Sequence, residues 1–317
     1  MNKVERILVT GVGLLGQAIV YSFKHSIFIQ KSGYELYTLS RSPSSLHSQL
    51  VKHFECDLKD YESIKKVIEE VKPTIIFHTA ANPNTKIDEN NPNGLILDNI
   101  LGTNNLLLAC TKLEVKPYIV FSSSVTVYGK FVEGYKTKSW DNVYPQSIYA
   151  TTKLACENLL ASYVPYGIGS ISVRLPALVG PGGTHGLVVD IIKKLKSDDK
   201  YLNLIGPAPG SKKPYFGAFD AAVFMREAAF DAIDRKDRVV EAETAMIGPS
   251  DSVTVEEVAH ILMNAMGIQK EIVWNDNNWP GDNRLINIDG NNSSLFESKT
   301  YIHLMGLLEK GNINNVL

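Results

Sequence analysis

A glycine-rich turn connects an apolar segment to a helical segment near the start of the chain. Residues 7–9 (ILV) predict a buried strand, and residues 10–16 (TGVGLLG) lead from it into a helix. Gly11 permits a tight turn, Gly13 lets a pyrophosphate approach the backbone, and Gly16 allows the helix to pack closely on the strand. The helix N-terminus also offers amide donors and a partial positive charge to phosphates. The sequence therefore predicts a strand–turn–helix unit that binds a dinucleotide.

Strands and helices alternate along the first half of the chain. The expected strands are residues 6–10, 34–39, 51–55, 74–78, 117–122 and 168–174. The expected helices are residues 14–25, 60–71, 95–113 and 147–163. This order predicts an α/β fold, a Rossmann-type doubly wound parallel sheet with helices on both faces. Ligands of such sheets bind at the carboxyl ends of the strands, where the glycine turn lies.

Glycine and proline interrupt this alternation after Pro176, at residues 180–183 (GPGG) and 206–210 (GPAPG). The later expected helices are residues 186–197, 219–233 and 254–266. We therefore expect a dinucleotide-binding domain over 1–176 and a smaller α/β lobe, mainly for substrate binding, over 177–317. We allow for segments of the second region that return to the first domain.

Composition and charge exclude several classes of function. The net charge is −2 with no basic block, which argues against nucleic acid as a partner. No apolar stretch approaches the roughly 18 residues of a membrane span, and the first residues lack the apolar region of a signal peptide, so we expect a cytoplasmic location. The seven histidines form no ligand cluster, so we expect no catalytic metal. The three cysteines lack metal-type spacing and are interpreted as reduced core residues: Cys56, Cys110 and Cys156.

A tyrosine and a lysine lie four residues apart in segment 147–153 (SIYATTK). On a helix, this spacing places Tyr149 and Lys153 on one face. The ammonium group favours the phenolate, so we expect the pKa of Tyr149 to fall from about 10 toward the range of a neutral-pH general acid or base. Such a pair can move a proton on and off an alcohol oxygen. Alone it is a weak signal, because the same spacing occurs on many solvated helices.

Together with the glycine turn and this pair, further motifs resemble the extended short-chain dehydrogenase/reductase family. Its members are NAD(P)-dependent epimerases, dehydratases and reductases that act mainly on nucleotide sugars. The resemblance covers nearly the whole chain, and its other segments are 57–58 (DL), 78–81 (HTAA), 99–107 (NILGTNNLL), 121–129 (FSSSVTVYG) and 174–181 (RLPALVGP). Fainter matches are Asp220, 280–282 (PGD) and Asp289.

The resemblance implies a catalytic triad of Ser124, Tyr149 and Lys153. Tyr149 would exchange a proton with a substrate hydroxyl or ketone, and Ser124 would hydrogen-bond the same oxygen. Lys153 would hold the nicotinamide ribose and keep the phenol acidic. Hydride would pass between the substrate and the nicotinamide, while the protein supplies position and acid–base help.

The cofactor contacts that we expect are Gly11, Gly13, Leu14, Leu15, Gly16, Ser40, Arg41, Asp57, Leu58, Thr79, Ala80, Ala81, Asn99, Ser122, Tyr149, Lys153, Leu175 and Pro176. The expected substrate contacts are Ser124, Thr126, Tyr149, His185, Lys213 and Arg284. Asn99 resembles a position that braces a helix, and Ser122 has local backbone hydrogen bonding as its alternative role. His78 is expected to pack near the cofactor.

The end of the second expected strand bears on the choice of cofactor. NAD-dependent enzymes commonly carry an acid there, whereas residues 40–42 are Ser-Arg-Ser. Arg41 can offer a planar fork to a 2′-phosphate, so NADP(H) is favoured, with NAD(H) as the alternative. The other interpretation of Arg41 is a solvated side chain that stacks on adenine. Asp57, by resemblance, meets the adenine amino group.

Departures from the family pattern bear on the reaction. Val125 and Thr126 stand where family 4,6-dehydratases have Asp-Glu, so dehydration is disfavoured. Our main prediction is an NADPH-dependent 4-keto-sugar reductase acting on a nucleotide-activated sugar. The alternative is an NAD-dependent nucleotide-sugar 4-epimerase similar to UDP-glucose 4-epimerase, and a lesser one is a non-catalytic NADP-binding sensor. Smaller ketones or aldehydes remain open as substrates.

The family often forms homodimers by pairing two helices from each subunit. The matching segments here are 95–113 and 147–163, so we expect a homodimer. Their leucines Leu106, Leu107, Leu159 and Leu160 either serve that interface or pack against the sheet.

Overall fold

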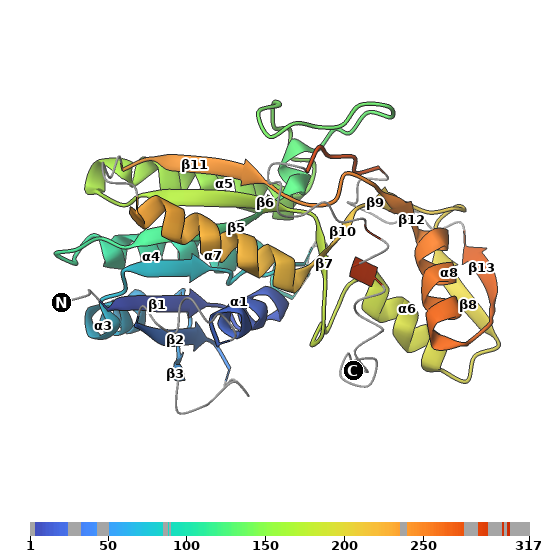
Figure 1. Cartoon of the computed structure of the whole chain (residues 1–317), viewed down its shortest axis with the longest axis horizontal. Helices are drawn as coiled ribbons and strands as arrows, with labels where there is room; N and C mark the ends of the chain where they lie inside the picture. Colours follow the sequence, from blue (N-terminus) through green and yellow to red (C-terminus); the bar gives the residue numbers. More distant parts are fainter. Residues whose placement is uncertain are drawn as a thin grey trace.

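The computed structural model describes residues 4–24, 33–42, 51–84, 88, 90–234, 240–275, 285–290, 300 and 303–304. They form two lobes, with the longer sheet in one and the smaller strand pairs mainly in the other (Figure 1).

A parallel seven-stranded sheet forms the centre of the first lobe. Its strands, in spatial order, are β11 (Ala242–Met246), β6 (Ser170–Leu175), β5 (Tyr118–Ser124), β4 (Ile75–His78), β1 (Glu5–Thr10), β2 (Tyr34–Ser40) and β3 (Val51–Glu55). Every neighbouring pair runs parallel. The predicted Rossmann-type α/β fold is confirmed, and the six strands predicted from the sequence are all present.

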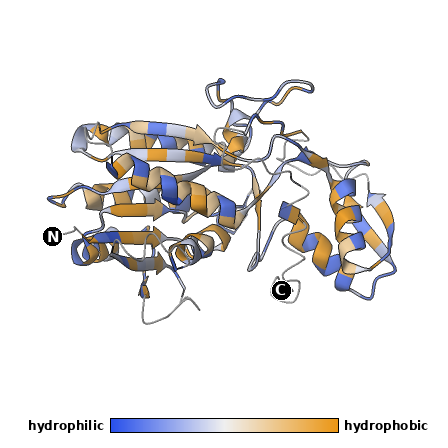
Figure 2. Ribbon diagram, in the orientation of Figure 1, coloured by the Kyte–Doolittle hydropathy of each residue, from blue (hydrophilic) through white to orange (hydrophobic). Residues whose placement is uncertain are grey.

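Alternation along the strands supplies an apolar surface to each face of the sheet. Ile7 and Val9 of β1 belong to one core with helices α1 (Leu14–Lys24) and α7 (Ala218–Asp234). Leu8, between them, belongs to the opposite core, which three other helices cover. These helices are α3 (Tyr61–Val71), α4 (Gly102–Cys110) and α5 (Ile148–Ser162). Figure 2 shows apolar colouring along the strands of this sheet as well as on helices of both lobes.

One expected helix differs from its prediction. Instead of one continuous helix over 95–113, the chain forms a π-helical segment η1 (Ile96–Leu101) followed by α4. The carbonyl of Asn99 accepts hydrogen bonds from the side chains of Thr103 at 2.6 Å and Cys156 at 3.3 Å, so part of its bonding capacity goes to side chains. Shorter 3₁₀ segments are η2 (Val125–Tyr128) and η3 (Val164–Tyr166).

The second lobe has a core of its own. Helices α6 (Leu187–Lys196) and α8 (Val255–Met266) pack with β8 (Tyr201–Ile205), which pairs with β13 (Glu271–Asn275). Two further pairs are β7 (Ala177–Val179) with β10 (Tyr215–Gly217), and β9 (Lys212–Lys213) with β12 (Val253–Thr254). A capping box between Thr254 and Glu257 begins α8. α7 and β11, although later in sequence than α6, lie with the first lobe (Figure 1).

Candidate active site

The glycine turn after β1 has the geometry that a pyrophosphate requires. Gly11 has a φ of +82° and donates its N–H to Leu39 O at 2.7 Å, which holds the turn against β2. A Cβ on Gly16 would lie 1.9 Å from Gly11 O, so only glycine fits where α1 approaches the turn. A Cβ on Gly13 would meet nothing within 4 Å. Open space over Gly13 beside a helix N-terminus therefore fits a dinucleotide cofactor.

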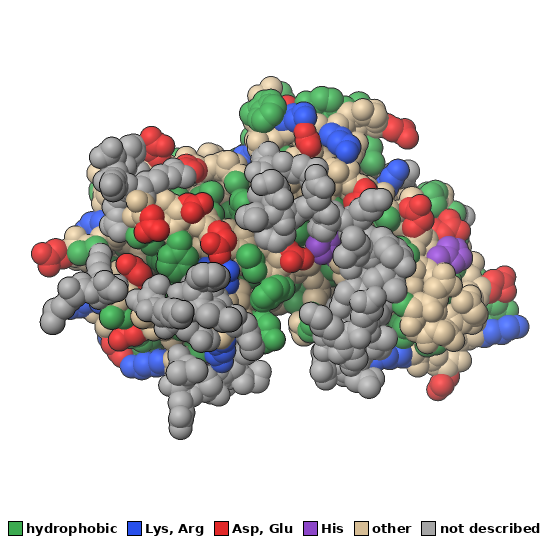
Figure 3. All heavy atoms as spheres, in the orientation of Figure 1, with side chains coloured by type: hydrophobic (Ala, Val, Ile, Leu, Met, Phe, Trp, Pro, Cys, Tyr) green, Lys and Arg blue, Asp and Glu red, His purple; other side chains and the backbone are tan. Residues whose placement is uncertain are grey.

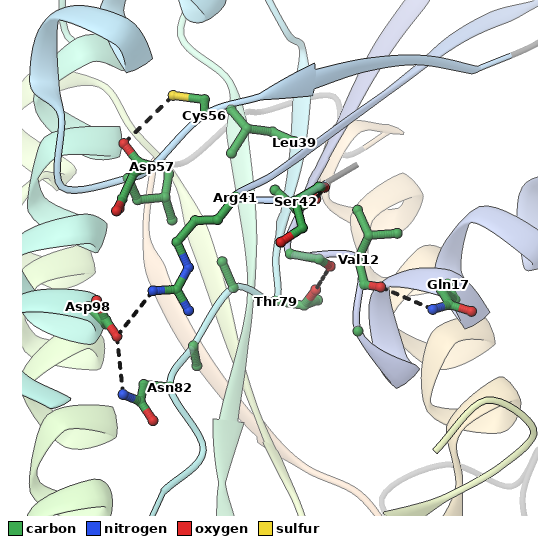
Figure 4. A pocket seen from close by; sticks show the side chains of 16 residues that line it. Val12, Gln17, Leu39, Arg41, Ser42, Cys56, Asp57, Thr79, Asn82 and Asp98 are labelled. Atoms are coloured by element: carbon green, nitrogen blue, oxygen red, sulfur yellow. Dashed lines mark hydrogen bonds and ion pairs between the residues drawn. The ribbon is translucent and has the colours of Figure 1, made fainter. Parts of the chain in front are cut away.

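A cavity of about 380 Å³ extends from this turn along the carboxyl ends of β1, β2 and β4 (Figure 4). The expected cofactor residues that line it are Gly11, Gly13, Ser40, Arg41, Asp57, Leu58, Thr79, Ala80 and Ala81. It is also lined by residues outside the expected cofactor contacts, namely Val12, Gln17, Leu39, Ser42, Cys56, Asn82 and Asp98. Most of these residues directly flank a motif position, so their closeness to the motifs in sequence could have predicted them.

Arg41 and Asp98 face each other across this cavity. Nη1 of Arg41 lies 3.6 Å from Oδ2 of Asp98, although 60% of the Arg41 side chain is exposed. Asp98 also pairs with Lys59 at 3.0 Å and accepts a hydrogen bond from Asn82 Nδ2 at 3.1 Å. The guanidinium that we assigned to a 2′-phosphate thus has an acidic partner within the chain.

Several other expected cofactor residues lie in supporting positions. The side chain of Asn99 is buried, donates to Thr152 Oγ1 at 2.9 Å and accepts from the backbone N–H of Asn82 at 2.7 Å, so it braces η1 against α5. Ser122 Oγ donates to the carbonyl of His78 at 3.3 Å. Residues buried among the helices and strands are Leu15, Gly16, Leu175 and Pro176, whereas Leu14 is partly buried.

Tyr149 and Lys153 lie one turn apart at the beginning of α5, whose first turn is capped by Ser147 Oγ accepting from Ala150 N at 3.1 Å. Lys153 is only 3% exposed and donates from Nζ to the carbonyl of Ser122 at 2.7 Å. Its Nζ lies 5.8 Å from the centroid of the Tyr149 ring. The helix therefore places the ammonium and the phenol side by side.

Burial decides the pKa values of both groups. It lowers the pKa of Lys153 to about 8, because the charged ammonium loses water. It raises the pKa of Tyr149 to about 12, because the phenolate would lose water. The expected lowering of the tyrosine pKa by Lys153 is therefore wrong for the protein chain by itself, since desolvation outweighs a cation whose charge is directed at the Ser122 carbonyl. With this raised pKa, Tyr149 is a protonated phenol in the chain without cofactor.

Ser124 ends β5 and caps η2. Its Oγ accepts hydrogen bonds from Thr126 N at 3.2 Å and from Thr126 Oγ1 at 2.9 Å. Because both contacts use its lone pairs, the hydroxyl hydrogen of Ser124 remains for donation to another oxygen. Thr126, expected as a substrate contact, acts here on the serine.

A buried ion pair supports the triad from behind. Glu157, one turn after Lys153, forms a bidentate pair with Arg174 of β6, at 3.0 and 2.7 Å. Ser123 Oγ donates to the same carboxylate at 2.5 Å, and Arg174 Nη1 donates to the Tyr128 hydroxyl at 2.9 Å. This pair was not predicted from the sequence, although the i+4 spacing after Lys153 places the glutamate on the same face of the helix.

His78 is completely buried beside the triad. Its Nδ1 lies 2.7 Å from Thr10 Oγ1 and its Nε2 lies 2.9 Å from Thr103 Oγ1. Thr103 donates its own proton to Asn99 O, so Nε2 carries the ring hydrogen and Nδ1 accepts from Thr10. Burial lowers the pKa of His78 to about 3, with a smaller contribution from Lys153. The ring is therefore neutral and joins β1, β4 and α4.

The expected substrate contacts lie farther apart from one another than the expected cofactor contacts do. His185 is exposed next to Thr184, and Lys213 lies partly buried in the short strand β9 of the second lobe. Arg284 lies outside the described residues. Acidic and basic side chains are interspersed over the face drawn in Figure 3.

A model of the NAD dependent epimerase/dehydratase family matches residues 7–214, a range that includes the glycine turn, the cavity and the triad. The chain belongs to this family. The matched range also contains Ser124, Tyr149 and Lys153, which the sequence predicts as a triad.

Several relatives of this epimerase/dehydratase family member are nucleotide-sugar epimerases by name, whereas another is named methionine adenosyltransferase 2 subunit beta. UDP-glucuronate 4-epimerase 4 of Arabidopsis thaliana is 34% identical over 135 residues, which cover 41% of this chain and 30% of that protein. The match thus spans about a third of that relative's length. The structure of Thermus thermophilus UDP-glucose 4-epimerase in complex with NAD is 25% identical, with a TM-score of 0.77 over 95% of this chain and 99% of that one. UDP-glucuronic acid 4-epimerase of Bacillus cereus shares the fold with a TM-score of 0.79 at 19% identity, over 98% and 99% of the two chains.

The described part of the chain contains no group of three or more His, Cys, Asp or Glu side chains arranged to hold a metal ion. Within the same residues, no helix is both long and apolar enough to cross a bilayer. All three cysteines are buried and unpaired.

Proposed function

We propose that this protein is an NAD-dependent epimerase that inverts C4 of a nucleotide-activated sugar. The observation that carries the proposal is the likeness to the UDP-glucose 4-epimerase of Thermus thermophilus, which extends over nearly the full length of both chains at 25% identity. The curated relative from Arabidopsis thaliana, also a UDP-sugar 4-epimerase by name, adds support over 41% of this chain. These likenesses favour the epimerase that we held as the alternative over the 4-keto-sugar reductase that was our main prediction.

The site offers the proton chemistry that this reaction needs. NAD, when bound, would supply a hydride acceptor for the sugar carbon. Oxidation of that carbon would pass the hydroxyl proton to Tyr149 as phenolate, and reduction of the ketone would return it, so the phenol, which is protonated in the chain without cofactor, must lose its proton before the cycle begins. Ser124 can donate its free hydroxyl hydrogen to the same oxygen, and Lys153 provides a cation beside the phenol. The space over Gly13 is suited to the pyrophosphate of the cofactor.

The direct test is epimerisation without added cofactor. Purified protein would be incubated with UDP-glucose, UDP-glucuronate or UDP-N-acetylglucosamine in D₂O, and the products identified by NMR. We expect the C4 epimer of at least one of these sugars, with no deuterium at C4, because the hydride is returned to the carbon it left. The Tyr149→Phe variant, prepared in the same way, controls for a contaminating epimerase. Absence of any epimer with NAD-loaded protein would contradict the proposal.

The reductase remains a second candidate because Arg41 lies in the cavity without an acid at the adjacent end of β2. It predicts oxidation of NADPH in the presence of a 4-keto nucleotide sugar. Mass spectrometry of small molecules released from the denatured protein separates the two. Retained NAD(H) supports an epimerase that recycles its cofactor, and an empty protein that oxidises NADPH supports a reductase.

We also propose that the protein forms a homodimer through η1 and the start of α5. Their exposed apolar side chains are Ile96, Leu97, Leu101 and Ile148. Three of the leucines considered from the sequence are fully buried in the sheet-facing core, namely Leu106, Leu107 and Leu160. Packing against the sheet therefore accounts for their apolar character. Light scattering after size exclusion should give twice the chain mass, and a Leu97→Glu variant should give the single chain mass.

A further inference from the structure

Four charged side chains gather at one end of the cofactor cavity. Arg41 follows β2, Asp57 follows β3 together with Lys59, and Asp98 belongs to η1. Nζ of Lys59 lies 3.6 Å from Asp57 Oδ2 and 3.0 Å from Asp98 Oδ1. Two cations thus meet two anions, and the cluster has no net charge.

Asp98 is the centre of this cluster. Only 11% of its side chain is exposed, and its carboxylate contacts Lys59, Asn82 and Arg41 from three different segments. Figure 4 shows Arg41 extending across the cavity toward Asp98 from the end of β2. Among the described residues, Asp98 is the one acidic group within ion-pair distance of the Arg41 guanidinium.

This arrangement bears on which dinucleotide the cavity accepts. A 2′-phosphate on the adenosine ribose brings nearly two negative charges at neutral pH. Its most direct cationic ligand, Arg41, would have to leave Asp98, and the phosphate would then share the cavity with the carboxylates of Asp98 and Asp57. A ribose with a free 2′-hydroxyl neither displaces Arg41 from Asp98 nor brings a negative charge close to the two carboxylates.

We propose that Asp98 is a specificity-determining residue, which holds Arg41 and thereby favours NAD(H) over NADP(H). The inference rests on the proposed use of a nicotinamide dinucleotide in this cavity. It explains how an arginine at the end of β2 is compatible with an NAD-dependent protein. Because Arg41 is mostly exposed, the ion pair is screened by water and contributes modestly, so the expected change in affinity ratio is about 5-fold.

The test is a set of binding titrations on protein freed of its cofactor. NADH and NADPH dissociation constants would be measured for the parent, Asp98→Asn, Arg41→Ala and the double variant at low and high salt. Asp98→Asn keeps the shape of the side chain and its capacity to accept from Asn82 Nδ2. Glu70→Gln is the matched control, because it removes one negative charge from an exposed pair with Lys52 on the same lobe.

We expect Asp98→Asn to improve NADPH binding relative to NADH by about 5-fold, with a smaller change at high salt. Arg41→Ala should weaken NADPH relative to NADH, and the double variant should lose the gain of Asp98→Asn. Glu70→Gln should leave the ratio unchanged. An unchanged ratio in Asp98→Asn, or a gain that survives in the double variant, would overturn the inference.

These measurements require no sugar turnover, so they are separate from the test of the proposed function. A protein that epimerises no sugar but shows the expected change in ratio would support the role of Asp98 and contradict the epimerase. A parent protein that binds NADPH more tightly than NADH would overturn the role of Asp98 and leave sugar epimerisation to its own test.

Discussion

Arg174 and Glu157 form a buried bidentate ion pair that links the strand β6 to the helix carrying Tyr149 and Lys153. Their side chains are 9% and 6% exposed. Ser123, next to Ser124, donates to the same carboxylate, and Tyr128 of η2 accepts from the guanidinium. The pair therefore holds together three elements on which the site depends.

Replacing Glu157 by Gln should leave the buried guanidinium without its counter-charge. We expect the free energy of unfolding to fall by about 3–5 kcal/mol, the usual cost of breaking a buried pair from one side. Urea unfolding of Glu157→Gln beside Glu70→Gln measures this difference. The control pair is more than half exposed on both sides and should cost about 1 kcal/mol or less. Equal losses in the two variants would show that the buried pair is not structural.

Ser124→Ala should lower turnover more than it lowers sugar binding. The hydroxyl hydrogen of Ser124 is free, so it can stabilise charge that develops on the substrate oxygen. We expect kcat to fall about 100-fold with a small change in KM, as for loss of one donor to a developing oxyanion. Ser124→Thr keeps the hydroxyl and should retain most of the rate. Steady-state kinetics decides, and a Thr variant as slow as the Ala variant would argue against donation by the hydroxyl.

Gly13 and Gly16 should respond differently to the same substitution. A Cβ at Gly16 would lie 1.9 Å from a backbone oxygen, so Gly16→Ala must displace the turn and should cost about 1–3 kcal/mol of stability. A Cβ at Gly13 meets only open space, so Gly13→Ala should unfold like the parent. It would nevertheless occupy the volume intended for the pyrophosphate, and NADH affinity should fall at least about tenfold. Thermal unfolding and NADH titration of both variants separate the two effects. Normal NADH binding by Gly13→Ala would contradict the placement of the pyrophosphate over Gly13.

The sheet was predictable because its signals are local. The central strands β1, β4 and β5 contain short apolar runs, and glycine at 11, 13 and 16 follows the first of them. The triad stays a prediction, which combines the spacing of Tyr149 and Lys153 within one turn of one helix with the family resemblance that added Ser124. Features that lie within a single segment could thus be predicted before the fold was known.

Features that depend on how segments meet could not be predicted in this way. Asp98 and Arg41 are far apart in sequence, and only the packing of η1 near the end of β2 brings their charges together. The pKa of Tyr149 was predicted in the wrong direction, because a sequence gives the spacing to Lys153 but not the burial that outweighs it. Likewise, nothing in the sequence shows that the Lys153 ammonium is directed at the carbonyl of Ser122.

His78 should make the stability of the protein depend on pH in the acid range. An unfolded histidine takes up a proton near pH 6.5, whereas the buried ring has a pKa of about 3. Between these values the unfolded state binds more protons than the native state, so the free energy of unfolding falls as the pH is lowered. For this one group the slope is about 1.4 kcal/mol per pH unit between roughly pH 6 and 4. Above pH 7 both states are neutral at this residue and the contribution is constant.

Urea unfolding at pH 7, 5.5 and 4.5 measures this slope, with His78→Gln expected to be less sensitive to pH than the parent. His185→Gln is the matched control, because it changes an exposed histidine, and its slope should follow the parent. If His78→Gln fails to fold, NMR of the parent gives the same information, since the His78 ring signals should not titrate above about pH 4. Titration of that ring near pH 6 would mean that water reaches it, and the neutral link between Thr10 and Thr103 would have to be abandoned.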